Sequence, residues 1–222
     1  LILRKTGMTE GILVTIAGSM AQLLVTIMAG SFSLVFFIQT FFHSTDNQSV
    51  SFFFLSGLLI LLPLMMLVLY LNLPHLRLNI PARSPALLDR LIRKLTIFSI
   101  YRRRDLLVIL LLSVIRYFIF TTQFYLLLRF FGVTINFFHA FELIAVVYLI
   151  TTLIPSVALT ELGIRGSVAI YVFSHYQPIA GVDPQVFSAA VLSASVTLWL
   201  INIGIPAAMG SFLIFKLKFR KR

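Results

Sequence analysis

Glu161 and Arg165 are the residues of this chain whose types and spacing could do chemistry. They lie four positions apart, with the acid first, so a helix would place the carboxylate and the guanidinium on one face in the favourable order. Thr160 is predicted to be the N-cap of that helix. A guanidinium can bind phosphate in a bidentate fashion, and a helix N-terminus also favours anions. The pattern therefore predicts a site for an anionic group.

Pro155, Gly163 and Gly166 interrupt the same stretch, which is otherwise apolar. The two glycines would let a helix or a lipid headgroup approach the backbone closely. Irregular backbone and charges at membrane depth are tolerated where protein or a cavity satisfies them. A second interpretation stays open: the stretch is an ordinary loop, and its ion pair is solvated and contributes about 0–1 kcal/mol.

Arg116 and Glu142 are further charges inside predicted membrane spans. Arg116 falls near the middle of its span, where an arginine needs a partner or a wet cavity. Glu142 is a candidate partner for Arg116 or Arg129, and it shares a helical face with His139. Such a pair could be purely structural or could belong to a transport path.

Composition identifies an integral membrane protein. Of the 222 residues, 59% are hydrophobic and 11% charged, which is too little polar surface to cover a soluble globule. There is no cysteine, and the four histidines form no ligand pattern, so we predict neither a metal site nor a cofactor. We found no nucleophile motif and no Gly-rich phosphate loop, which favours a function other than catalysis.

The basic residues predict the orientation in the cell (inner or plasma) membrane. All lysines and arginines except Arg116, Arg129 and Arg165 lie near the two ends or between residues 73 and 105. Such clusters mark the cytoplasmic side and attract anionic headgroups, so we expect anionic phospholipid as the partner, and not nucleic acid. Both termini and the 73–105 loop are then cytoplasmic. Within that loop, residues 87–95 have the spacing of an amphipathic interfacial helix, with a soluble basic loop as the alternative.

The fold class predicted is all-α, a polytopic bundle of about six spans in one transmembrane domain, residues 1–222. The segment near 155–176 is expected to be broken or re-entrant, as in transporter binding sites. The 11–42 span is longer than a bilayer needs, and residues 30–33 are its expected weak point. The predicted spans cover residues 11–42, 51–72, 106–131, 136–154, 156–176 and 185–215.

Pro155 followed by Glu161-Leu162-Gly163-Ile164-Arg165-Gly166, set among hydrophobic helices, resembles the signature region of the lysylphosphatidylglycerol synthase transmembrane family, which is flippase-like. Gly163-Ile164-Arg165 matches the usual Gly-x-Arg-Glu of that family, whereas Gly166 stands where Glu is common and the acid comes earlier, at Glu161. Members are generally longer, and this chain starts at Leu1, so the resemblance implies a fragment that lacks N-terminal helices.

Three functions follow as hypotheses. The first is binding, and translocation between leaflets, of phospholipid or lipid-linked anions. The second is the membrane part of a phosphatidylglycerol lysyltransferase-type enzyme, and the third is an envelope scaffold without catalysis. A homo-oligomer is left open. The residues predicted to bind substrate are Thr160, Glu161, Gly163, Arg165, Gly166, Arg116 and Glu142.

Overall fold

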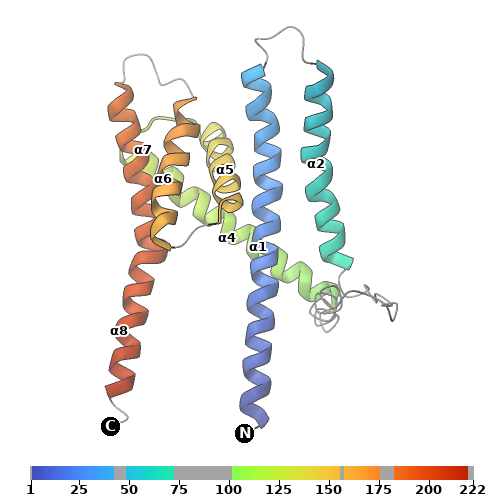
Figure 1. The fold of residues 1–222 in the computed structure, drawn as a ribbon, viewed down its shortest axis with the longest axis vertical. Coiled ribbons are helices and arrows are strands. Elements are labelled where there is room, and N and C mark those ends of the chain that lie inside the picture. The colour runs from blue at the N-terminus through green and yellow to red at the C-terminus, as the bar shows by residue number, and fades with distance from the viewer. Residues whose placement is uncertain (1, 43–48, 73–101, 156–157, 176–182, 220–222) are drawn as a thin grey trace. The chain divides into compact units, whose positions relative to one another are not determined.

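The computed structural model describes residues 2–42, 49–72, 102–155, 158–175 and 183–219, and these contain helices but no strand (Figure 1). The elements are α1 (Ile2–Phe42), α2 (Ser49–Asn72), α4 (Arg103–Phe130), α5 (Phe137–Leu153), α6 (Ala158–Ser174), α7 (Pro184–Trp199), the π-helix η3 (Leu200–Gly204) and α8 (Ile205–Phe219). The last three, α7, η3 and α8, follow one another without a break and form one long rod.

The chain is an all-helical integral membrane protein. Four stretches of helix in its described part are long and apolar enough to cross a bilayer: Val14–Gln39, Phe54–Asn72, Arg103–Phe130 and Pro184–Phe212. Many large apolar side chains on them point outward, such as Phe54 and Phe130, which are 78% and 80% exposed. A soluble protein rarely exposes contiguous apolar surface of this kind, whereas lipid covers it at no cost.

By its internal contacts the chain divides into two compact units, and the division falls inside α4. The first unit comprises Leu1–Phe118 and the second Ile119–Arg222. In the first, α1 packs on α2, and the start of α4 joins their core. Ala17 and Ala21 of α1 are completely buried there, because small side chains let helices approach closely. Tyr70 of α2 is also buried and donates a 3.5 Å hydrogen bond to the carbonyl oxygen of Leu106.

The second unit holds the other core. α5 packs on α6, and α6 packs on α7. Phe124 of α4 and Phe173 of α6 are both completely buried, with ring centroids 6.2 Å apart, so aromatic packing joins the end of α4 to α6. Other buried side chains of this core are Leu128, Leu143, Ile144, Val147, Ala169, Val172, Val191, Ala194 and Leu198.

Helix α1 continues through residues 30–33, the expected weak point of this long span, without a break. Ser31 and Ser33 are both buried, which shows that packing accommodates these small residues within the helix.

The chain is irregular at Ile154 and Pro155, and α6 is uninterrupted from Ala158 onward. Its 17 residues extend about 25 Å, somewhat less than the roughly 30 Å hydrocarbon core. The predicted amphipathic helix at residues 87–95 lies outside the described residues.

The π-helical turn η3 has a local cause in the sequence. Pro206 follows it, and a proline cannot donate a backbone hydrogen bond to the preceding turn, while its ring crowds the carbonyl group there. The N–H of Ile205 instead reaches back five residues to the carbonyl oxygen of Leu200. The wider turn carries Asn202, whose Nδ2 donates to Leu198 O at 3.1 Å and to Gln123 Oε1 of α4 at 3.2 Å.

Candidate functional site

Glu161 and Arg165 lie on one face of α6, as the sequence predicted. An Nη atom of Arg165 donates to Oε1 of Glu161 at 2.6 Å, one helical turn earlier. The two side chains are 21% and 28% exposed, so the pair is neither buried in the core nor free in solvent. Because one face of one helix supplies both groups, the local sequence is sufficient to bring them together. The predicted pairing of Glu161 with Arg165 on one helical face is confirmed.

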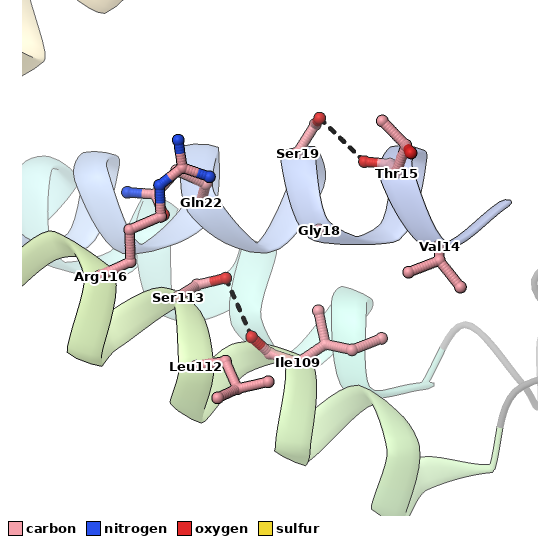
Figure 2. Close-up of a pocket in the computed structure, with 9 residues that line it drawn as sticks. All are labelled: Val14, Thr15, Gly18, Ser19, Gln22, Ile109, Leu112, Ser113 and Arg116. Atoms are coloured by element: carbon pink, nitrogen blue, oxygen red, sulfur yellow. Dashed lines mark hydrogen bonds between the residues drawn. The ribbon is translucent and has the colours of Figure 1, made fainter. Parts of the chain in front are cut away.

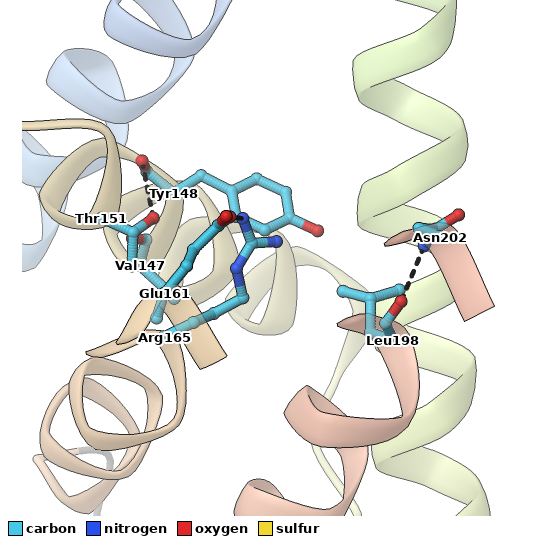
Figure 3. A network of polar contacts seen from close by, with 7 residues as sticks. All are labelled: Val147, Tyr148, Thr151, Glu161, Arg165, Leu198 and Asn202. Carbon is cyan, nitrogen blue, oxygen red and sulfur yellow. Dashed lines mark hydrogen bonds and ion pairs between the residues drawn. The ribbon is translucent and has the colours of Figure 1, made fainter. Parts of the chain in front are cut away.

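Tyr148 of α5 is a third member of this site. The guanidinium carbon of Arg165 lies 5.9 Å from the centroid of its ring, which is cation–π distance. The hydroxyl of Tyr148 donates to the carbonyl oxygen of Phe120 in α4 at 3.2 Å, which fixes the ring. Figure 3 shows the guanidinium between Glu161 and this ring. The sequence analysis missed Tyr148, since no spacing links it to Arg165.

The donors of Arg165 are not all used. Its Nε atom is buried, and none of the described residues accepts a hydrogen bond from it. A buried N–H group of a guanidinium that makes no hydrogen bond costs free energy. A hydrogen-bond acceptor placed beside it would remove that cost. Glu161 accepts a hydrogen bond from one edge of the planar guanidinium group, which has five N–H donors in all. Arg165 therefore keeps a donor that none of the described residues satisfies.

Thr160 is not at the helix position that the sequence analysis predicted. Helix α6 begins at Ala158, so Thr160 lies within its first turn and is not the N-cap. Thr160 is exposed.

Gly163 and Gly166 differ in their surroundings. A Cβ atom at Gly166 would lie 2.6 Å from Cδ1 of Leu192 in α7, whereas a Cβ at Gly163 would meet no atom within 4 Å. Gly166 thus allows α6 and α7 to approach each other, as small residues do in membrane helix pairs. Gly163 leaves open space beside the turn that holds the ion pair.

We expect Gly166→Leu to lower the thermal stability of the detergent-solubilised chain, because the new side chain must displace Leu192. Gly163→Leu is the matched control and should leave the melting temperature nearly unchanged. Thermal unfolding followed by circular dichroism measures both. Equal melting temperatures of the two variants would contradict the packing role of Gly166.

Arg116 and Glu142 belong to different units. Glu142 contacts His139 on its own helix, with 3.4 Å between Oε2 and Nδ1, and the side chains of His139 and Glu142 are 55% and 37% exposed. Arg116 lines a pocket of the first unit, described below. The pairing of Arg116 with Glu142 stays a prediction. Within the described residues, no group of three or more His, Asp or Glu side chains is arranged to hold a metal ion.

Comparisons with family models, with curated proteins and with solved structures found no match. The site is therefore interpreted from its own geometry. In the second unit, Glu161, Arg165 and Tyr148 come together, with Gly163 beside them.

Proposed function

We propose that this integral membrane protein binds the anionic headgroup of a phospholipid or a lipid-linked anion and moves it between leaflets. The observation that supports this most directly is Arg165, whose guanidinium is held by Glu161 and Tyr148 but keeps a buried Nε donor without an acceptor among the described residues. A phosphate oxygen is an acceptor that fits such a donor.

The ion pair also suits a transporter on energetic grounds. Glu161 neutralises much of the charge of Arg165, so a bound anion is held mainly by directional hydrogen bonds. A translocation site must bind well enough to admit its ligand and weakly enough to release it. A lone buried guanidinium would hold a phosphate too tightly and would itself be costly to bury.

The residues from Pro155 to Gly166 resemble the lysylphosphatidylglycerol synthase transmembrane family, and this resemblance supports the same ligand class.

We also propose the cell membrane as the location, with both ends of the chain cytoplasmic, on the basis of the basic clusters. Cysteines introduced at Asn47 and Ser84 test this orientation. A membrane-impermeant thiol reagent should label the first in intact cells and the second only after permeabilisation, and the reverse pattern would contradict it.

Reconstitution tests the function directly. The purified chain in liposomes should accelerate the movement of a fluorescent anionic phospholipid between leaflets, measured by dithionite quenching, and a zwitterionic analogue should move less. Protein-free liposomes prepared in parallel are the control. Equal rates with and without the protein would contradict translocation. Lipid modification that depends on charged tRNA would identify the enzymatic alternative instead.

A further inference from the structure

We infer a second headgroup site, in the first unit, between α1 and the start of α4: it takes an anionic lipid whose headgroup also carries a hydrogen-bond donor. The inference rests on the proposed function for the class of ligand, a lipid with an anionic headgroup. It concerns a different unit of the chain and different residues.

The site is a pocket of about 550 Å³, which lies within the usual range for small-ligand sites. Apolar side chains line much of it, including Val14, Ile109 and Leu112, and they suit an acyl chain. Arg116 and Gln22 bring polar groups to it from the two helices, and Figure 2 shows the guanidinium of Arg116 rising toward α1 at the level of Gln22. The lining thus combines an apolar wall with a positive charge, as an anionic amphiphile requires.

The hydroxyl groups of Ser19 and Ser113 add acceptors to the pocket rather than donors. Ser19 donates its hydroxyl hydrogen to Thr15 O at 2.9 Å, and Ser113 donates to Ile109 O at 2.9 Å, as Figure 2 shows. These two hydroxyl hydrogens are used within their own helices, so only the oxygen lone pairs of Ser19 and Ser113 remain for a ligand. The charge of Arg116 attracts an anion, whereas these oxygens need a donor.

The side chain of Gln22 indicates which class of headgroup fits the pocket. Its Oε1 atom is buried, and no described residue donates a hydrogen bond to it. A buried acceptor without a donor costs free energy, and a deprotonated phosphodiester group cannot satisfy it because that group has no proton to give. A headgroup with a hydroxyl or ammonium group beside its phosphate can donate to Gln22 while its phosphate faces the positive charge of Arg116.

Gly18 provides a way to close the pocket without removing a polar group. It lies in the lining, and a Cβ atom there would meet nothing within 4 Å. Leucine at this position would project into space that the ligand needs, and leucine is a better helix former than glycine. Gly57 of α2 is the matched control, since a Cβ there also meets nothing within 4 Å and it does not line the pocket.

The experiment titrates the full chain in detergent with lipids and counts bound molecules by native mass spectrometry. The probes are phosphatidylglycerol and phosphatidylpropanol, which have the same charge and carbon skeleton but differ in the headgroup hydroxyls. We expect phosphatidylglycerol to bind about tenfold more tightly, as one well-placed hydrogen bond allows. Gln22→Leu should abolish this preference, whereas Arg116→Gln should weaken both lipids about tenfold. Gly18→Leu should also weaken both, and Gly57→Leu should leave both unchanged.

Other results would overturn the inference. Equal binding of the two lipids by the unaltered chain would remove the donor requirement, and identical binding by Gly18→Leu and Gly57→Leu would remove the site. Competition by glycerol 3-phosphate as strong as that by the lipid would indicate a soluble anion as the ligand. If only Arg165→Ala lowers lipid binding, the inference fails while the proposed function stands. If only the pocket variants lower it, the site assigned to Arg165 fails instead.

Discussion

Replacing Arg165 by alanine should slow the movement of anionic lipid in liposomes roughly 100-fold, because the substitution removes the charge and the buried Nε donor together. A hydrogen bond to a charged group is worth about 1.5–3 kcal/mol, and each 1.4 kcal/mol is tenfold in binding. Two such bonds from one guanidinium to a phosphate would account for the effect. Dithionite quenching of a fluorescent anionic lipid measures the rate.

The conservative variant separates charge from geometry. Arg165→Lys keeps the charge but loses the planar fork, so we expect an intermediate loss of transport. Arg129→Ala is a matched control, since Arg129 is an exposed arginine in the last turn of α4 and its loss should leave the rate within twofold. Unchanged transport by folded Arg165→Ala would show that residues 155–166 are only a connection between helices, and the function proposed for them would be abandoned.

Replacing Phe173 by alanine should cost about 3–5 kcal/mol of the free energy of unfolding, the largest stability effect we expect. Phe173 is completely buried and packs against the ring of Phe124, so alanine would leave a cavity where α6 meets α4. The same helix carries Glu161 and Arg165, so a shift of α6 would also disturb the ion pair and its contact with Tyr148.

Phe130→Ala is the control for that substitution, because Phe130 is 80% exposed and lies at the end of α4. Its loss leaves no cavity, and we expect a change within about 0.5 kcal/mol. Unfolding in detergent mixtures, followed by circular dichroism, measures both variants. Similar losses for the two phenylalanines would mean that Phe173 does not hold α6 in place.

The sequence by itself predicted the class of protein and the ion pair. Its high apolar content requires a membrane, and in lipid an apolar stretch must form a helix to satisfy its own backbone. Glu161 and Arg165 were predictable as a pair for the same reason, because four residues along one helix bring their side chains together wherever that helix lies. Composition and helical periodicity are local properties, so they can be read from the chain.

Only the tertiary structure decided which helices meet, and therefore what surrounds those charges. Tyr148 reaches Arg165 because α5 packs on α6, and Gly166 serves packing because Leu192 of α7 lies against it. Gln22 and Arg116 share a pocket although the sequence places them far apart. In lipid, apolar surface is nearly equivalent all round a helix, so hydrophobicity along the chain does not select partners; small residues and a few polar contacts between helices do.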